Sequence, residues 1–276
     1  MTLTKEDLEF LQYSSDETEM EGWHRVGKLL ADGKLNWAPI HEPRAVLDVG
    51  CGTGTWTKDF AARQPTSQCL GIDLDVPDET QFTPNCRFRS IDVESDWGYV
   101  EEFDYIYIRG LAACIIDWPG LFRQCWKALR PGGYMEISDF GYSSKSETDS
   151  LDRTSGLLRW EQLINEAGDR SPRKVAIASA FLGLMREAGF SDITELIKQV
   201  PYSGWSTNPL ARKIGQLSNP LHKLGLKNLG LAVLCSVSGM SPADVDREFD
   251  AACADMDNPD RQCWMPLHIV YGQKPE

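Results

Sequence analysis

The distribution of hydrophobic and polar residues along the chain predicts short buried strands separated by helices. Runs rich in apolar residues predict strands at 45–49, 69–73, 87–91, 103–108, 134–140, 193–200 and 267–271. The run from Ala45 to Val49 is apolar apart from Asp48 and shows no polar alternation. That pattern is typical of a strand buried on both faces of a parallel sheet.

Helical patterns fill most of the segments between these runs. They predict helices at 4–11, 17–30, 56–63, 151–167 and 175–188, and a largely helical stretch over 205–264. A further helix is expected to begin with Asp117 as its cap and to stop at Pro131, and Ser241-Pro242 opens a clear helix late in the chain.

Alternating strands and helices imply an α/β fold with a doubly wound, mostly parallel, seven-stranded sheet. A chain of 276 residues is long enough for one large core. We expect a single domain over 1–276, with residues 1–40 as an N-terminal helical lid. The helical stretch 205–264 is expected to be a cap inserted before the last strand.

The chain turns sharply after the first strand, through Gly50, Gly52 and Gly54. Glycines would allow positive φ and close approach of a ligand, and would leave amide N–H groups free at a helix start. The dinucleotide pattern G-x-G-x-x-G is not met, since Thr55 or Thr57 stands where its third glycine belongs. No Gly-Lys-Ser/Thr follows, which excludes a P-loop. The turn therefore predicts a different nucleotide-like ligand carrying an anionic group.

Charge and composition narrow the class of protein. The net charge of −13 and the lack of a basic stripe argue against a nucleic-acid surface. Eight cysteines without C-x-x-C or metal spacing are expected to be buried thiols in a reducing compartment. The polar start lacks an apolar signal core, and Leu229–Val237 is too short to span a bilayer. We therefore expect a soluble cytoplasmic protein.

The acid followed by G-x-G-x-G resembles motif I of the class I S-adenosylmethionine (SAM) methyltransferases. The resemblance implies that the turn, Cys51 included, holds the methionine part of SAM, with Asp48 near its ammonium group. Asp73, 19 positions after Gly54 and at the end of the second strand, can accept both ribose hydroxyls. The resemblance assigns Asp92 to the adenine amino group. The adjacent Leu74 and Val93 belong to the same predicted cofactor site.

Further short patches occur over most of the chain. They are Tyr13 with Asp16-Glu17, Asp32-Gly33-Lys34-Leu35, Pro84-Asn85-Cys86-Arg87-Phe88, Ile108-Arg109-Gly110-Leu111, Asp117-Trp118-Pro119, Pro131-Gly132-Gly133-Tyr134 and Val270-Tyr271-Gly272. Together these patches are similar to the fungal LaeA-like methyltransferases. Where relatives commonly have Gln-His, this chain has Trp23-His24, and Ala113-Cys114 replace the usual Gly and Ser. These departures bear on the identity of the substrate.

Two residues are candidates for catalysis. His24 on the predicted lid is the candidate general base, because histidine titrates near neutrality; the alternative is a lid histidine that only forms a hydrogen bond. Arg109 ends the fourth strand and is expected to orient an acidic substrate or SAM, or to form a structural ion pair. Asp139 is a weaker acid/base candidate, with a loop-start acid as the alternative.

Aromatic residues are the candidates for binding the substrate. Tyr13, Trp118, Trp205 and Trp264 are predicted to form an aromatic wall around a planar acceptor, or else to be core and cap packing. The four histidines lack ligand spacing, so no metal site is predicted.

The resemblance implies transfer of a methyl group from SAM to an oxygen or nitrogen of a small-molecule fungal secondary metabolite. One alternative is a LaeA-type regulatory SAM-binding protein that acts through protein partners. The other is a methyltransferase fold recruited for non-methylating catalysis. The sequence names no acceptor.

Overall fold

The computed structural model describes residues 17–77 and 83–276. The predicted helix at 4–11 and the predicted substrate residue Tyr13 lie outside the described residues. In the described part of the chain, no helix is long and apolar enough to cross a membrane.

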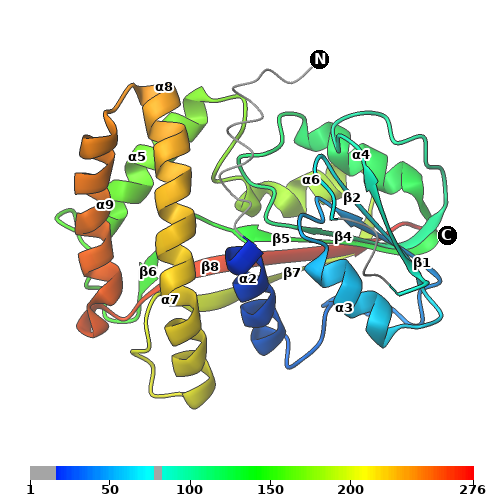
Figure 1. Ribbon diagram of the computed structural model, residues 1–276, viewed down its shortest axis with the longest axis horizontal. Coiled ribbons are helices and arrows are strands. Elements are labelled where there is room, and N and C mark those ends of the chain that lie inside the picture. Colours follow the sequence, from blue (N-terminus) through cyan, green and yellow to red (C-terminus); the bar gives the residue numbers. More distant parts are fainter. Residues whose placement is uncertain (1–16, 78–82) are drawn as a thin grey trace.

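One sheet runs through the protein, with strand order β3-β2-β1-β4-β5-β8 and β7 paired to the other edge of β8 (Figure 1). The first five strands in this order, from β3 through β2, β1 and β4 to β5, pair in parallel. Strand β8 is antiparallel to both β5 and β7. The strands are β1 (Ala45–Val49), β2 (Gln68–Asp73), β3 (Cys86–Ser90), β4 (Phe103–Arg109), β5 (Leu129–Phe140), the two-residue β6 (Lys145–Ser146), β7 (Ser191–Pro201) and β8 (Cys263–Gln273). The predicted mostly parallel α/β sheet is therefore confirmed. Among the described residues it has eight strands rather than the predicted seven, because the short β6 also pairs with β8.

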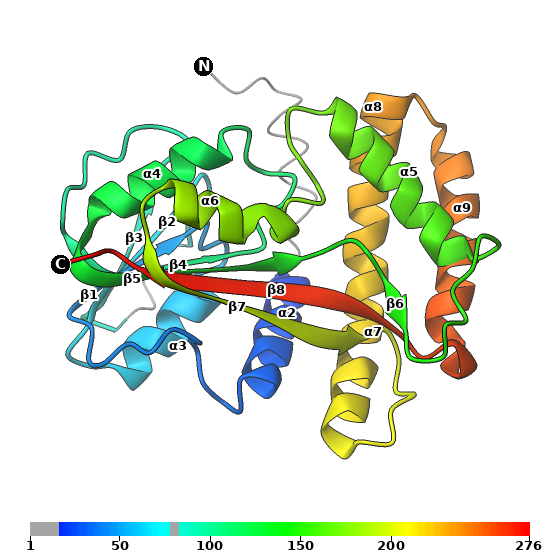
Figure 2. The same ribbon diagram turned by 180° about the vertical axis from the view of Figure 1, so that it is seen from behind.

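Helices cover both faces of the sheet. They are α2 (Glu17–Leu30), α3 (Thr55–Arg63), α4 (Trp118–Ala128), α5 (Gly156–Arg170), α6 (Phe181–Glu187), α7 (Pro209–Gly230), α8 (Ser236–Ser238) and α9 (Pro242–Asp257). Seen from behind, α4 and α6 lie on one side of the sheet and α2 and α3 on the other (Figure 2). This arrangement is that of a doubly wound fold.

The two faces bury separate apolar clusters. Leu121 and Phe122 of α4 pack with Phe181 of α6 against the sheet. On the opposite face, Trp56 of α3 stacks on Tyr107 with ring centroids 4.0 Å apart. Burial on both faces explains why β1 carries no polar alternation.

Capping explains where two helices begin. The Asp117 carboxylate accepts a hydrogen bond from the amide of Gly120 at 2.8 Å, and the Ser241 hydroxyl accepts one from the amide of Asp244. Each cap satisfies a backbone donor that the first helical turn leaves unpaired. Both predicted helix starts are confirmed.

Several predicted boundaries are wrong. Strand β5 begins at Leu129 rather than at Tyr134, and α4 ends at Ala128, because the predicted helix stop at Pro131 lies inside β5. The last strand begins at Cys263 rather than after Pro266, because Pro266 lies inside β8 and its carbonyl accepts the amide of Gly141. Helix α5 begins at Gly156, since Ser155 caps it and bonds to Asp255 on α9. The predicted helix 175–188 is a 3-10 turn, Ala178–Ala180, followed by α6.

The helices between β7 and β8 pack together with α5, which precedes β7. Their shared cluster includes Leu157 and Trp160 of α5, Leu226 of α7 and Phe249 of α9. Helix α7 also packs along α2, where Leu221 lies against Gly22. This second contact forms one boundary of the candidate site.

Glu161 on α5 joins this helical region to the loop after β5. Its buried carboxylate accepts the amide and hydroxyl of Ser144, and that hydroxyl lies 2.7 Å from the Tyr202 hydroxyl. Burial raises the pKa of Glu161 to about 7. The Glu161 carboxyl therefore keeps its proton up to about pH 7 in the folded state, whereas in the unfolded state it loses the proton at lower pH.

We predict that Glu161→Gln removes a pH-dependent part of the stability. Because the folded pKa is raised, the stabilisation from Glu161 is full below its ordinary pKa and is lost as pH rises through about 7. Between about pH 5 and pH 8 the wild type should lose roughly 3 kcal/mol relative to Glu161→Gln, at about 1.4 kcal/mol per pKa unit. Urea unfolding at both pH values measures this difference. The exposed Glu166→Gln on the same helix is the control, and equal pH slopes in wild type and Glu161→Gln would contradict the prediction.

Candidate functional site

The turn after β1 has three positions that favour glycine. Gly50, Gly52 and Gly54 all have positive φ, at 72°, 51° and 70°. A Cβ on Gly50 would lie 2.5 Å from the Leu111 side chain, and one on Gly52 would lie 2.5 Å from Cε of Met20 on α2. The loop after β4 and helix α2 therefore both approach this turn.

Four amides of the turn donate hydrogen bonds within the fold. Gly50 and Cys51 both donate to the carbonyl of Ile72, Gly54 donates to the carbonyl of Cys51, and Gly52 donates to Asp73 Oδ2 at 2.7 Å. The reason is that the turn folds back onto the end of β2. The donors without a side-chain cap are at the start of α3, the helix start at which the sequence predicts free amides, because the Gly54 N-cap supplies no side-chain hydrogen bond.

Asp48 lies beneath the turn and is 3% exposed. It accepts a hydrogen bond from the hydroxyl of Thr57 on α3. Burial raises the pKa of Asp48 to about 7, although the Thr57 hydrogen bond and the nearby Arg109 charge lower it. The carboxyl is thus held by the fold close to its point of titration at neutral pH.

The other predicted cofactor residues follow the ends of β2 and β3. Asp73 Oδ1 accepts the amide of Leu74 at 2.7 Å. Burial raises the pKa of Asp73, and the hydrogen bonds from the amides of Gly52 and Leu74 partly oppose this rise. Asp92 Oδ1 accepts the amide of Glu94, and the Val93 carbonyl accepts the indole N–H of Trp97. Asp73 pairs with Ser90 in the parallel register, so both acids lie at the same edge of the sheet.

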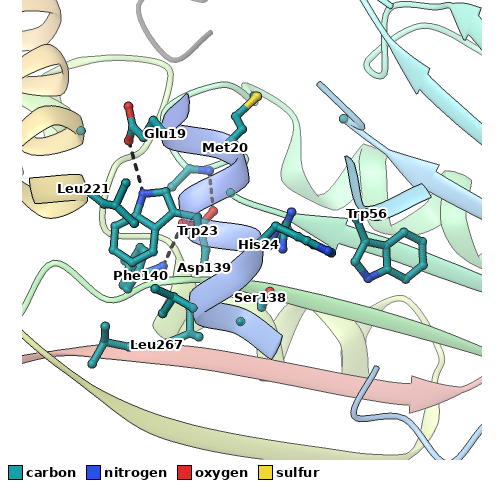
Figure 3. Close-up of a pocket in the computed structure, with 18 of the residues that line it drawn as sticks. Glu19, Met20, Trp23, His24, Trp56, Ser138, Asp139, Phe140, Leu221 and Leu267 are labelled. Carbon is teal, nitrogen blue, oxygen red and sulfur yellow. Dashed lines mark hydrogen bonds between the residues drawn. The ribbon is translucent and has the colours of Figure 1, made fainter. Parts of the chain in front are cut away.

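A cavity of about 290 Å³ opens between the glycine turn, α2, α7 and the ends of β4 and β5 (Figure 3). The predicted site residues that line it are His24, Asp48, Gly50, Cys51 and Arg109. Gly52 adjoins it through Met20, which is itself a lining residue. Residues from four separate elements are therefore brought to one cavity.

His24 is buried beside Asp59 of α3. Its Nε2 lies 2.9 Å from Asp59 Oδ2, and Lys28 and Arg63 also pair with Asp59. Burial lowers the pKa of His24 although the Asp59 hydrogen bond raises it, so the ring is neutral at neutral pH. Because a carboxylate only accepts, Nε2 carries the proton, and the lone pair is on Nδ1, which is buried without a partner among the described residues.

Asp59 was not predicted from the sequence as a site residue. Hydrogen bonds from Lys28, His24 and Arg63 outweigh the effect of burial and lower the pKa of Asp59 to about 2. Its carboxylate is thus fully ionised at neutral pH. The fixed negative charge holds the His24 ring in one orientation.

Arg109 extends from the end of β4 towards α2. Its guanidinium lies 5.9 Å from the Tyr107 ring centroid, and Nη1 would lie 3.7 Å from a Cβ on Gly27. Its charge lowers the pKa values of Asp48 and His24, although burial has the larger effect on each. Arg109 therefore places positive charge between the glycine turn and α2.

The three predicted tryptophans that the structure describes lie away from the cavity. Trp118 packs against Phe181 in the core, with ring centroids 5.2 Å apart. The Trp205 indole donates to the carbonyl of Cys263, and the Trp264 indole donates to Glu147. As a correction, the aromatic residues that line the cavity are Trp23, Trp37, Trp56, Tyr107, Phe140, Tyr142 and His222.

Asp139 has a structural role that its sequence position did not reveal. Its two carboxylate oxygens accept the amides of Ala112 and Phe140 at 2.7 and 2.8 Å. Burial raises its pKa to about 6. Asp139 thereby fixes the loop after Arg109, and it also lines the cavity.

A family model described as a methyltransferase domain matches residues 23–195, which cover β1 to β5, the glycine turn and α2 from Trp23 onward. The chain belongs to this methyltransferase family. Its relatives include methyltransferase cpsF of Aspergillus campestris, which is 31% identical over 82% of this chain and 84% of its own length. Secondary metabolism regulator LAE1 of Cochliobolus heterostrophus is 32% identical over 82% of this chain and 76% of its own length.

Solved structures agree on the fold of this methyltransferase. Phosphoethanolamine N-methyltransferase 2 of Haemonchus contortus, solved with S-adenosylhomocysteine, matches with a TM-score of 0.57 at 15% identity. The match covers 99% of this chain and 61% of that enzyme. At this identity the likeness shows a shared fold.

Proposed function

We propose that this methyltransferase transfers the methyl group of SAM to an oxygen or nitrogen of a small fungal secondary metabolite. SAM is the methyl donor. The observation that carries the proposal is the cavity that joins the glycine turn, Asp48, Arg109 and His24. A donor site and a candidate proton acceptor thus border the same enclosed space.

The residues at the turn fit the donor. The positive φ of Gly50 and Gly52 leaves a backbone cradle without Cβ atoms. Asp48 would hold the ammonium group of SAM. Because the amides of all three turn glycines and of Cys51 already donate within the fold, we assign the SAM carboxylate to Arg109 and to the uncapped start of α3.

The end of β2 and the end of β3 would hold the adenosine. Asp73, fixed by the amides of Gly52 and Leu74, would accept the ribose hydroxyls. Asp92 would accept the adenine amino group, with Leu74 and Val93 beside the ring. When bound, SAM supplies an electrophilic methyl group on a sulfonium, and positioning of the acceptor contributes most of the catalysis.

His24 is proposed as the general base. Its neutral imidazole has Nε2 bonded to Asp59, so Nδ1 would take the proton from an acceptor hydroxyl or N–H. Asp59 would stabilise the imidazolium that results. Helix α2, which carries His24, would act as the lid over the donor.

Incubation with SAM and an extract of the source fungus tests the proposal. We expect S-adenosylhomocysteine to form together with a product one methyl group heavier than its precursor. Because LAE1 is about as similar as cpsF, a regulatory protein is the second candidate. SAM binding without any small-molecule turnover, together with a co-purified protein partner, would favour it. An isomerised product formed without S-adenosylhomocysteine would favour a methyltransferase fold recruited for non-methylating catalysis.

We predict that Asp73→Asn weakens binding of S-adenosylhomocysteine about 10- to 100-fold. Asparagine keeps one acceptor oxygen, so the variant loses one charge-assisted hydrogen bond to the ribose, which contributes about 1.5–3 kcal/mol. Calorimetry with S-adenosylhomocysteine and its 2′-deoxy analogue measures the effect. The wild type should prefer the ribose form, and the variant should lose that preference. The exposed neighbour Asp75→Asn is the control, and a preference that survives in Asp73→Asn would contradict the ribose role.

A further inference from the structure

The cavity has two chemically different halves on either side of α2. Figure 3 shows His24 pointing to one side of α2, towards Trp56, and Trp23, Phe140, Leu221 and Leu267 gathered on the other side. The first half contains the glycine turn and Arg109. The second half lies between α2, α7 and the sheet, and the proposed donor residues do not reach it.

Three rings form the wall of this second half. Trp23 of α2 lies 4.8 Å from Phe140 of β5 and 4.8 Å from His222 of α7, between ring centroids. Phe140 and His222 are 5.3 Å apart at an edge-on angle of 62°. Apolar side chains of Val200, Leu221, Leu226, Leu229, Met265, Leu267 and Ile269 complete the wall. Aromatic and aliphatic walls of this kind suit a flat, largely apolar molecule.

His222 is a polar group within this apolar wall. The residue is 3% exposed, and its Nε2 is buried with no hydrogen-bond partner among the described residues. Burial lowers the pKa of His222 to about 3, so the ring is neutral at physiological pH. A buried polar group without a partner destabilises the fold, and the hydroxyl or N–H of a ligand would offset that cost.

The cavity is lined by the cations Lys28, Lys34 and Arg109, and two acidic groups lie beside these rings. The Glu19 carboxylate accepts the Trp23 indole N–H at 3.3 Å and approaches Gly225 of α7. Asp139 directly precedes Phe140 and lines the same cavity. Negative charge here disfavours an anionic ligand, because like charges repel strongly where water is excluded.

We propose that the second half of the cavity binds the methyl acceptor as a flat, uncharged aromatic molecule, and that His222 hydrogen-bonds its hydroxyl or N–H. The inference rests on the proposed function and names the substrate class for it. His222 is then a residue that positions and selects the acceptor, distinct from His24, which takes the proton. A site that hydrogen-bonds a hydroxyl rejects analogues that lack one.

Three probe molecules test this assignment on the full chain saturated with S-adenosylhomocysteine. They are 2-naphthol, 2-methylnaphthalene and 2-naphthoate, and quenching of tryptophan fluorescence measures their binding. We expect 2-naphthol to bind about tenfold more tightly than 2-methylnaphthalene, as one net hydrogen bond allows. We expect 2-naphthoate to bind at least tenfold more weakly than 2-naphthol.

Two variants separate hydrogen bonding by His222 from packing. His222→Phe keeps a ring in the cluster and should abolish the preference for the hydroxyl while leaving the affinity for S-adenosylhomocysteine unchanged. His222→Gln restores a hydrogen-bonding group and should recover part of the preference. The exposed His41→Phe serves as the matched control and should behave as wild type.

The outcomes distinguish this inference from the proposed function. If S-adenosylhomocysteine binds but wild type shows no hydroxyl preference, or His222→Phe retains it, the role of His222 is wrong and the proposed function stands. Equal binding of 2-naphthoate and 2-naphthol would overturn the uncharged acceptor class. If wild type fails to bind S-adenosylhomocysteine in calorimetry, the proposed function itself fails.

Discussion

Gly52→Val abolishes binding of S-adenosylhomocysteine, with a loss of at least 100-fold, while the protein remains folded. At φ 51° any side chain is strained by about 1–2 kcal/mol, and a Cβ would lie 2.5 Å from Cε and 2.9 Å from Sδ of Met20. These are terminal atoms of a flexible side chain, so Met20 can move aside and the core is preserved. The added isopropyl group then blocks the cradle that the donor needs. Isothermal titration calorimetry gives the affinity, and circular dichroism reports the fold.

Gly98→Val is the matched control for backbone strain. Gly98 has a similarly positive φ of 73°, and a Cβ there would meet no atom within 4 Å. Gly98→Val should have about the same backbone strain as Gly52→Val. It should nevertheless bind S-adenosylhomocysteine as tightly as the wild type. Unaltered affinity in Gly52→Val would remove the glycine turn from the donor site.

His24→Ala lowers turnover by about 100-fold or more, while the affinity for S-adenosylhomocysteine stays within about threefold of wild type. General base catalysis contributes about 10²–10⁴ in rate. Asp59 keeps its partners Lys28 and Arg63 in the variant, so α2 stays attached to α3. Formation of S-adenosylhomocysteine with the acceptor found in the extract assay measures turnover. In wild type the acidic limb of the rate profile should lie below the ordinary histidine pKa of about 6.5, because burial lowers the pKa of His24.

Arg63→Gln tests whether the ion-pair network alone explains the effect of His24. Arg63 pairs with Asp59 from the exposed side and does not line the cavity. Its loss should leave turnover within a few-fold of wild type. Wild-type turnover in His24→Ala would show that His24 only fastens α2 to α3.

Local sequence patterns were sufficient to predict most strands of the sheet. The run Ala45–Val49 and helix Glu17–Leu30 have the predicted bounds, because burial and periodicity are local signals that do not depend on distant partners. The start of β8 was missed because Pro266 looks like a strand breaker. Its carbonyl nevertheless accepts the amide of Gly141, and this pairing with the chain after β5 keeps Pro266 inside β8.

Predictions for side-chain roles depended on contacts that the sequence does not contain. Trp118 was a candidate for binding the substrate, or else for core packing. At the start of α4 its side chain lies in the core and packs against Phe181. The Trp23-His24 pair was noticed as a departure from relatives, and both residues line the cavity. Asp59 and His222 carry no motif, so only packing of α3 and α7 against α2 reveals them.

Local sequence features were enough to predict the proposed donor half of the cavity. The glycine turn and the acids after the next two strands are local features, because parallel strands bring their carboxyl ends to one edge. The proposed acceptor half is visible only in the folded chain, where α2, β5 and α7 supply Trp23, Phe140 and His222 from positions up to about 200 residues apart. The physical reason is that a cavity wall is defined by packing between distant elements, and no spacing along the chain encodes it.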